Sequence, residues 1–191
     1  MTRQLWTAPN QLTLLRLIFI PFIVMNVAEG DYAWALGLFV AAGVSDALDG
    51  LLARLLEQKT VLGRYLDPIA DKLLLSTLFL VLSFKSHIPW KVTILVLSRD
   101  VIIIVICTLV YLTMNFRDFR PSIFGKANTV SQVVTIGFVL LDQLTVQSWV
   151  ALATQICLWL TFGLTILSGV HYVIRLGQQL YQLHPGRPTA A

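Results

Sequence analysis

The segment SDALDGLLARLLEQKTVLGRYLDPIADKLLL, residues 45–75, decides how the rest of the chain is interpreted. It carries four aspartates, Asp46, Asp49, Asp67 and Asp71, in a chain of 191 residues of which 57% are hydrophobic. The mean hydropathy of +0.77 is far above that of a soluble domain of this length. The segment therefore places charged side chains in a protein whose composition predicts a membrane environment, and something must stabilise them there.

The hydrophobic stretches predict one domain, residues 1–191, that is an all-α integral membrane protein. Stretches long enough to cross about 30 Å of hydrocarbon recur along the chain, and the alternation typical of membrane β-strands is absent from the sequence. The breaks between the stretches are short and polar. We expect six transmembrane helices after a short N-terminal interfacial segment, with approximate spans 11–28, 32–55, 61–84, 89–114, 123–142 and 148–176.

The distribution of Lys and Arg predicts the orientation of these helices, because short cytoplasmic loops carry the excess of positive charge. An even number of helices places both termini on one side. The basic residues expected near that side are Arg3, Arg54, Lys59, Arg64, Arg117, Arg120, Lys126, Arg175 and Arg187. The opposite side has Lys85 and Lys91. We therefore expect both termini to be cytoplasmic, and the net charge of +4 indicates contact with anionic membrane lipids rather than nucleic acid.

The four aspartates are predicted to occupy two levels of a helical hairpin. If one helix ends near residue 55 and the next begins near residue 61, Asp49 and Asp67 lie roughly 9 Å from the turn, and Asp46 and Asp71 roughly 14 Å. The i,i+3 spacing puts Asp46 and Asp49 on one helix face, and the i,i+4 spacing does the same for Asp67 and Asp71. The four carboxylates can therefore converge on one point.

Divalent cations are the predicted partners of these carboxylates. One charged side chain at this depth costs on the order of 3 kcal/mol and four cost roughly 12 kcal/mol, more than the stability of a typical domain. Nearby basic residues fit less well, because Lys72 points away from the face of Asp71, and Arg54 and Arg64 lie at the turn, where they suit a phosphate. Two hard divalent ions with oxygen ligands would neutralise all four charges. The sequence predicts a two-metal site that opens to the cytoplasm.

Three small residues lie next to the predicted site, namely Gly50, Ala53 and Gly63. Their missing side-chain bulk would let a flat or phosphorylated ligand approach the backbone. Taken singly, each residue is also typical of close packing between membrane helices. Their register with the carboxylates favours a ligand.

Together these residues resemble the signature of the CDP-alcohol phosphotransferase family, D-x2-D-G-x2-A-R-x8-G-x3-D-x3-D. Every fixed position and every spacer is matched between residues 46 and 71. The six predicted helices and the N-terminal PNQLTLLRL, residues 9–17, extend the resemblance over most of the chain. The resemblance implies a homodimeric membrane enzyme that transfers a phosphoalcohol group from a CDP-linked donor to an acceptor hydroxyl and releases CMP.

The resemblance also implies roles for individual residues. The four aspartates would hold two divalent ions, Mg²⁺ or Mn²⁺, and Asp71 would in addition act as the general base. Arg54 would contact the diphosphate of the donor. The expected contacts of the cytidine diphosphate moiety are Gly50, Ala53, Gly63, Asn10 and Thr13. The alternative for Asn10 is a helix N-cap.

The acceptor is the least determined part of the prediction. The chain resembles the branch of the family that uses CDP-diacylglycerol, in which phosphatidylglycerophosphate synthases carry two cations where this chain has Cys107 and Asn128. A small dianionic acceptor such as glycerol 3-phosphate needs charged donors. Arg99, followed by Asp100, and Lys126 look more like the cardiolipin synthases of the family, whose acceptor is phosphatidylglycerol. We therefore favour phosphatidylglycerol and keep glycerol 3-phosphate as the alternative.

The expected acceptor contacts are Arg99, Arg120 and Lys126. For Arg99 the alternative is a salt bridge with an acidic neighbour, with Asp100 itself expected to point elsewhere on the helix. A different class of protein, a cation transporter, would also place aspartates in the membrane. That alternative is disfavoured because residues 89–191 contain no second copy of the aspartate hairpin.

Overall fold

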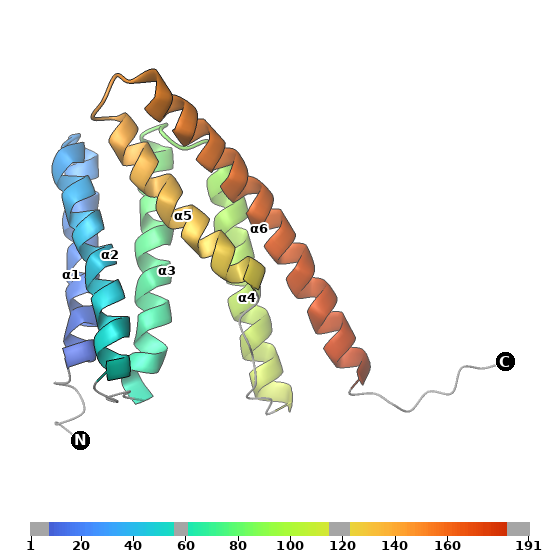
Figure 1. Ribbon diagram of the computed structural model, residues 1–191. Coiled ribbons are helices and arrows are strands. Elements are labelled where there is room, and N and C mark those ends of the chain that lie inside the picture. Colours follow the sequence, from blue (N-terminus) through green and yellow to red (C-terminus); the bar gives the residue numbers. More distant parts are fainter. Residues whose placement is uncertain (1–7, 56–60, 115–122, 183–191) are drawn as a thin grey trace.

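The computed structural model describes residues 8–55, 61–114 and 123–182, and within them the side chains of residues 15–46, 70–105 and 123–174. These residues form six α-helices (Figure 1). The helices are α1 (Ala8–Glu29), α2 (Tyr32–Leu55), α3 (Val61–Phe84), α4 (Trp90–Met114), α5 (Ile123–Asp142) and α6 (Ser148–Gln182). The predicted all-helical fold with six helices is confirmed.

The first and last helices of the chain are longer than the sequence predicted. Helix α1 begins at Ala8, so residues 8–10 of the expected interfacial segment are helical, and Asn10 lies inside the helix. The N-cap alternative for Asn10 is therefore wrong, while residues 1–7 lie outside the described part of the chain. Helix α6 runs to Gln182, past the predicted end at 176, because the polar residues that follow the apolar stretch also favour a helix.

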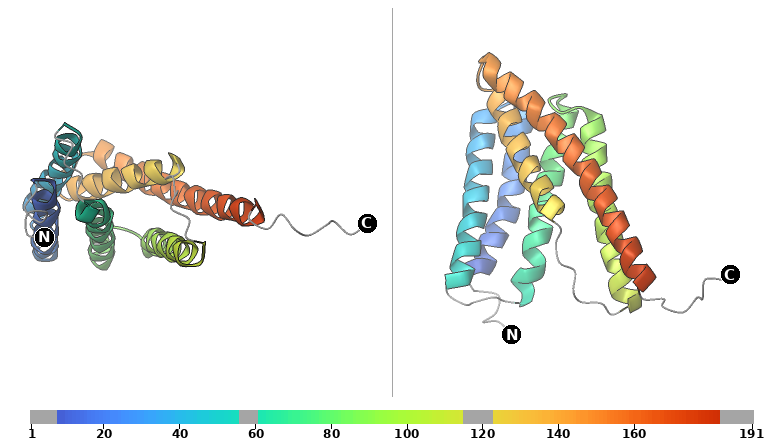
Figure 2. Two further views of the ribbon diagram at one scale, coloured as in Figure 1. Left: turned by 90° about the horizontal axis from the view of Figure 1, so that it is seen from below. Right: turned by 45° about the vertical axis from the view of Figure 1, so that its right-hand side comes forward.

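The helices pack in two groups, α1 to α3 and α4 with α6, which are connected by α5 and by the contact of α3 with α4. Helix α1 packs against α2 and α3, and α5 packs against α2, α3 and α6. Helix α4 packs against α3 and α6. Figures 1 and 2 show that the first residues of α1, the last residues of α2 and the first residues of α3 lie at one end of the molecule, as do the last residues of α4 and α6. The residues of the aspartate hairpin therefore lie toward this end.

A tight turn makes α1 and α2 antiparallel neighbours. Gly30 has a positive φ of 88°, a conformation that glycine adopts without a steric penalty. The Asp31 amide donates to the Asn26 carbonyl at 2.8 Å, which closes the end of α1. Counting from this turn at about 1.5 Å per residue, Arg16 on α1 and Asp46 on α2 come to similar levels. The turn thus decides which residues of the two helices face each other.

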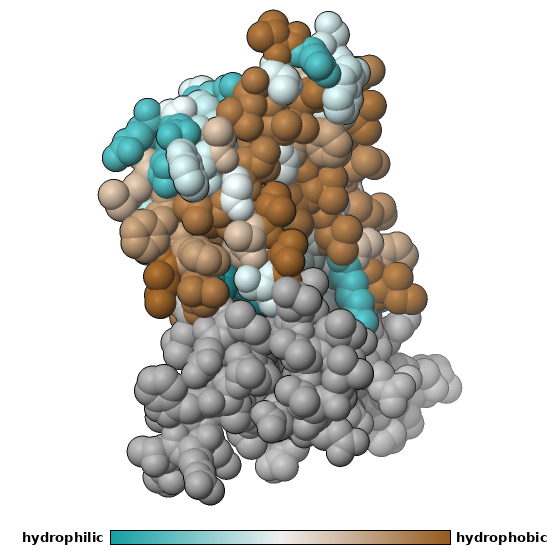
Figure 3. All heavy atoms as spheres, turned by 60° about the vertical axis from the view of Figure 1, so that its left-hand side comes forward, coloured by the Kyte–Doolittle hydropathy of each residue, from teal (hydrophilic) through white to brown (hydrophobic). Residues whose placement is uncertain are grey.

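The surface of the helices is largely apolar. Large hydrophobic side chains such as Trp34, Ile94 and Leu152 are more than half exposed. Figure 3 shows one face that is mostly hydrophobic below a hydrophilic upper end. Among the described residues, α5 and residues 148–174 of α6 are long and apolar enough to cross a membrane. The structure thus contains two candidate spans of the six that the sequence predicts.

Hydroxyl groups join α5 to α6 along their contact. Thr161 of α6 bonds to Ser131 at 2.6 Å and to Thr135 at 2.8 Å, and Thr165 donates to the Asn128 side chain at 2.9 Å. Thr154 donates to a backbone carbonyl of α5. In apolar surroundings such bonds fix one helix against another. We call the residues Ser131, Thr135, Thr154, Thr161 and Thr165 the hydroxyl seam.

Candidate active site

Two of the four aspartates meet at a single arginine. The Arg16 guanidinium, from α1, donates through Nη2 to Oδ1 of Asp46 on α2 and through Nη1 to Oδ1 of Asp71 on α3. Arg16 is 1% exposed, whereas the side chains of Asp46 and Asp71 are 47% and 41% exposed. The arginine therefore lies on the inner side of the pair, and the carboxylates have an outer side that a ligand can reach.

This geometry agrees with the levels derived from the sequence. Asp46 and Asp71 were placed at the same depth of the hairpin, and the structure brings both within reach of one guanidinium. Asp49 lies one turn further along α2, and Asp67 one turn before Asp71 on α3. Their side chains lie outside the described part of the structure. The convergence of all four carboxylates stays a prediction.

The predicted donor contacts are placed only at the level of the backbone. Asn10 and Thr13 belong to α1, and Gly63 to the first turn of α3. Gly50, Ala53 and Arg54 belong to the last two turns of α2. The side chains of these residues are outside the described part of the chain. All of them lie at the same end of the molecule as the aspartate hairpin (Figure 1).

The side chains of Arg99 and Asp100 on α4 lie differently from the prediction. We expected Asp100 to point away from Arg99, but Arg99 Nη1 donates to Asp100 Oδ1 at 2.7 Å. Consecutive helical residues do diverge at Cβ, yet the long arginine side chain curves back to its neighbour. Both carboxylate oxygens of Asp100 also accept hydrogen bonds from Lys72 Nζ, each at 2.8 Å. Arg99 Nη2 donates to the hydroxyl of Ser168 on α6 at 2.5 Å. Arg99 thus forms the salt bridge with an acidic neighbour that was the alternative to acceptor binding.

The same network explains where Lys72 points. Lys72 was predicted to lie off the face of Asp71, and it reaches α4 instead, where Asp100 is nearly fully buried. Two cations around one carboxylate leave this cluster with a net positive charge, next to the aspartates but on the other side of α3. Lys72 is therefore not available to neutralise Asp71.

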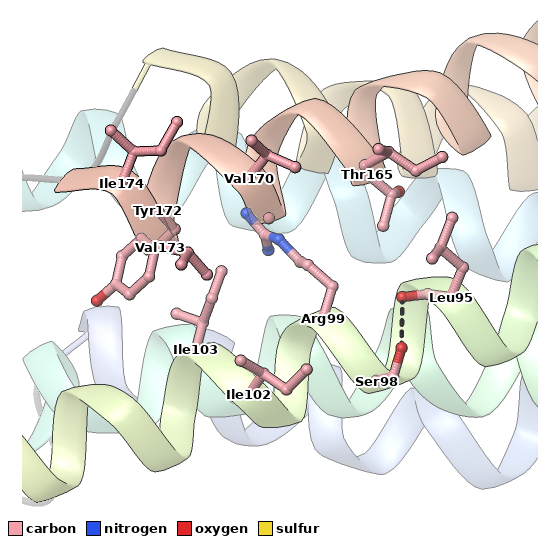
Figure 4. Close-up of a pocket in the computed structure, with 12 residues that line it drawn as sticks. Leu95, Ser98, Arg99, Ile102, Ile103, Thr165, Val170, Tyr172, Val173 and Ile174 are labelled. Carbon is pink, nitrogen blue, oxygen red and sulfur yellow. Dashed lines mark hydrogen bonds between the residues drawn. The ribbon is translucent and has the colours of Figure 1, made fainter. Parts of the chain in front are cut away.

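An apolar pocket of about 390 Å³ lies between α4 and α6 beside Arg99. Figure 4 shows the Arg99 side chain extending from α4 toward α6, with Val170 and Thr165 on the facing helix. The Nε atom of Arg99 has no hydrogen-bond partner among the described residues. Most of the remaining lining is aliphatic, including Ile102 and Ile103. A pocket of this kind suits a hydrocarbon chain better than a small polar molecule.

The other predicted acceptor contacts are not gathered at this pocket. Lys126 lies in the first turn of α5 and is exposed. Arg120 lies outside the described residues. Asn128, which stands where the resemblance led us to look for a cation, is fully buried and accepts the Thr165 hydroxyl. Asn128 therefore contributes to the packing of α5 on α6.

The residues described here fit a divalent cation. Carboxylate oxygens are the ligands that Mg²⁺ and Mn²⁺ prefer, and Asp46 and Asp71 present such oxygens from two helices within reach of one side chain. Their partial exposure leaves a path to the site. Within the described side chains there is no group of three or more acidic, His or Cys residues, since Asp49 and Asp67 are not among them. Two of the four predicted ligands are thus among the described side chains, and the metal site stays a prediction.

Arg16 is the residue of this site that the sequence reasoning missed. Arg16 lies outside the aspartate hairpin from which the site was predicted, in the segment PNQLTLLRL that extends the family resemblance. Two signals were present. Arg16 is the one charged residue between Asn10 and Glu29 in an apolar helix, and its distance from the turn at Gly30 matches that of Asp46 on the opposite side. A buried charge at a matching level predicts an ion pair.

The comparison with family models assigns the chain. Residues 6–167 match the model of the CDP-alcohol phosphatidyltransferase family, and the chain belongs to this family. The family is membrane-associated and consists of phospholipid-synthesising transferases, as the resemblance of the aspartate motif implied. The match supports an enzyme and leaves the cation-transporter alternative without support.

Relatives of two names are similar to this chain. The chain is 34% identical over 147 residues to the cardiolipin synthase (CMP-forming) of Homo sapiens, covering 69% of this chain and 49% of that protein. The Rattus norvegicus protein of the same name is 35% identical with the same coverage. The probable phosphatidylglycerophosphate synthase of Mycobacterium tuberculosis (strain ATCC 25618 / H37Rv) is 35% identical over 178 residues, or 87% of this chain and 79% of that one. The chain spans about half the length of the human and rat relatives.

Proposed function

We propose that this protein transfers a phosphatidyl group from CDP-diacylglycerol to the hydroxyl of an acceptor and releases CMP. The observation that carries the proposal is the complete aspartate motif, two of whose members, Asp46 and Asp71, lie together on neighbouring helices with an exposed outer side. The family membership and the relatives' names support the same reaction class.

Different residues of the chain would have different roles in this reaction. Asp46, Asp49, Asp67 and Asp71 would hold two Mg²⁺ or Mn²⁺ ions, which would polarise the donor phosphoryl group and stabilise the leaving oxygen. Asp71 would accept the proton of the acceptor hydroxyl. Arg54 would bind the diphosphate, and the small residues Gly50, Ala53 and Gly63, with Asn10 and Thr13, would admit the cytidine moiety. Most of the rate enhancement would then come from positioning and charge stabilisation.

We further propose that all six helices cross the membrane, with the site and both termini on the cytoplasmic side, and that the protein is a homodimer. The start of α1 and the end of α6 lie at one end of the molecule, which supports an even number of crossings. The basic residues that the sequence predicts at that end support its cytoplasmic location. The homodimer is implied by the family resemblance.

For the acceptor we propose phosphatidylglycerol, so that the product is cardiolipin. The pocket beside Arg99 supports an acceptor that brings its own acyl chains, and the cluster of Lys72, Arg99 and Asp100 supports a single negative charge near it. Arg120 and Lys126 remain the other proposed acceptor contacts. A phosphate dianion would need several charge-assisted donors, and Asn128 provides none. Glycerol 3-phosphate, with phosphatidylglycerophosphate as product, is the alternative, since relatives of both names match.

The test is an assay of the purified protein with CDP-diacylglycerol, Mg²⁺ or Mn²⁺, and either acceptor. We expect CMP release that depends on phosphatidylglycerol, cardiolipin by mass spectrometry, and loss of both in excess EDTA. Asp46→Asn, which alters a proposed metal ligand, should abolish turnover, whereas the matched control Asp142→Asn, which removes a carboxylate at the opposite end of the molecule, should keep activity. Conversion of glycerol 3-phosphate with no reaction of phosphatidylglycerol would establish the alternative, and full activity in excess EDTA would contradict metal dependence.

A further inference from the structure

Arg16 approaches the candidate site from the protein interior. Its side chain is 1% exposed, and it reaches between Asp46 and Asp71 from α1, which packs on both α2 and α3. The two carboxylates are almost half exposed on their other side. The site therefore has a fixed cation behind it and an open approach in front.

Arg16 uses the same two groups that the proposed metal ions need. Each of its two Nη atoms donates to an Oδ1 atom, one on Asp46 and one on Asp71. A guanidinium has only donors, so it cannot serve as a metal ligand, and it keeps its charge at every physiological pH. A divalent cation at these carboxylates is therefore repelled by Arg16, which already binds one oxygen of each of them.

We propose that Arg16 is the resident counter-ion of the carboxylate site, which holds Asp46 and Asp71 together in the metal-free protein and competes with the divalent cation for them. This inference rests on the metal dependence of the proposed function. The ion pairs with Arg16 hold the two carboxylates together when no divalent cation is bound. When a divalent cation is present, competition from Arg16 weakens its binding, so that the cation exchanges readily.

Loss of the Arg16 charge has opposite effects on the two states. Without metal, Asp46 and Asp71 would lose the guanidinium that joins them, and the fold would lose stability. With metal, the competitor would be gone and the cation would bind more tightly. If Arg16 only positioned the carboxylates, its loss would disorder these ligands, and the divalent cation would bind more weakly.

The main variant is Arg16→Met, which keeps much of the side-chain length without the charge. The matched control is Lys91→Met, which removes one positive charge at the opposite end of the molecule. Both are compared with the unaltered protein in nanodiscs of neutral phosphatidylcholine. Free Mn²⁺ is measured by electron paramagnetic resonance during titration, and thermal midpoints are recorded in EDTA and in Mn²⁺.

For Arg16→Met we expect Mn²⁺ to bind about tenfold more tightly or better, the midpoint in EDTA to fall, and the Mn²⁺-dependent rise in midpoint to grow. Lys91→Met should match the unaltered protein in Mn²⁺ affinity and in the Mn²⁺-dependent rise in midpoint, while its midpoint in EDTA should fall slightly, because Lys91 Nζ lies 5.1 Å from the centroid of the Trp159 ring. Equal or weaker Mn²⁺ binding by the folded Arg16→Met variant would overturn the proposal.

Arg16→Lys keeps the proposal testable if Arg16→Met does not fold. Lysine retains the charge but lacks the fork that binds two carboxylates at once, so Mn²⁺ should bind more tightly than to the unaltered protein, and unchanged or weaker binding overturns the proposal here too. The readout needs no turnover. Tighter Mn²⁺ binding without any CMP release would overturn the proposed function alone, whereas no Mn²⁺ binding by the unaltered protein would overturn the metal site that both share.

Discussion

Asp71 combines two proposed roles, and a substitution can separate them. Asp71→Asn keeps an oxygen for the metal but cannot accept a proton, so the chemical step should slow by roughly 10²–10⁴, while CDP-diacylglycerol still binds. Single-turnover CMP release and equilibrium binding of the donor measure the two effects. If the variant lost donor binding and kept its rate per bound donor, Asp71 would be a ligand and not the base.

Gln132 of α5 is a buried residue whose side-chain amide lacks partners. It is fully buried, and neither its Nε2 nor its Oε1 atom has a hydrogen-bond partner among the described residues. Gln132→Leu removes two unsatisfied polar atoms at similar volume, so the free energy of unfolding should rise by about 1 kcal/mol. Thermal or denaturant unfolding in detergent measures the change.

Thr135 of the hydroxyl seam provides the matched control for this prediction. It is fully buried on the same helix, and it bonds to Thr161 at 2.8 Å and to the Cys157 carbonyl at 3.1 Å. Thr135→Val should therefore lower the free energy of unfolding by about 1 kcal/mol. If Gln132→Leu lowered it equally, the Gln132 amide would have a partner, such as an ordered water molecule.

The connection between α3 and α4 is tied to the start of α2 by a histidine. His87 Nε2 lies 2.7 Å from the Tyr32 hydroxyl, and the two rings pack edge to face. Burial and the nearby Lys85 lower the pKa of His87, and Asp142 opposes them. The folded protein therefore binds this proton less readily than the unfolded chain, and stability should be lost as the pH falls below about 6.5.

The measurement is the thermal midpoint between pH 8 and pH 5.5. In His87→Asn the group cannot titrate, so the difference between this variant and the unaltered protein should shrink as the pH falls. A difference that stays constant over this range would show that His87 does not contribute to the pH dependence. Tyr32→Phe, which removes the hydroxyl and keeps the histidine, should retain a pH dependence of the same sign.

At the level of elements, the sequence predicted helices well and side-chain partners less well. The bounds of α2, α3 and α5 agree with the predicted spans because short polar breaks interrupt otherwise apolar stretches. The shared level of Asp46 and Asp71 followed from counting residues to the turn. The pairing of Arg99 with Asp100 did not follow, because helical periodicity gives the direction of Cβ and says little about where a long side chain ends.

At the level of the whole molecule, the arrangement of the helices determines contacts that cannot be predicted by counting residues within one hairpin. Arg16 belongs to a third helix, and its place between the aspartates depends on how α1 packs against α2 and α3. The pocket beside Arg99 likewise joins α4 to α6, which α5 separates in the chain. Such contacts depend on the tertiary packing, whereas the family signature lies within one segment and could be recognised directly.

The Lys72, Asp100 and Arg99 cluster sets an order of events during synthesis. The chain emerges from its N-terminus, so α3 with Lys72 is complete before α4 brings Asp100 and Arg99. The carboxylate can therefore pair with both of its cations before α5 and α6 are made. The bond from Arg99 to Ser168 forms only after almost the whole chain has been made. The chain order thus allows the buried acid to be paired early, whereas the bond that attaches α6 to Arg99 can form only at the end of synthesis.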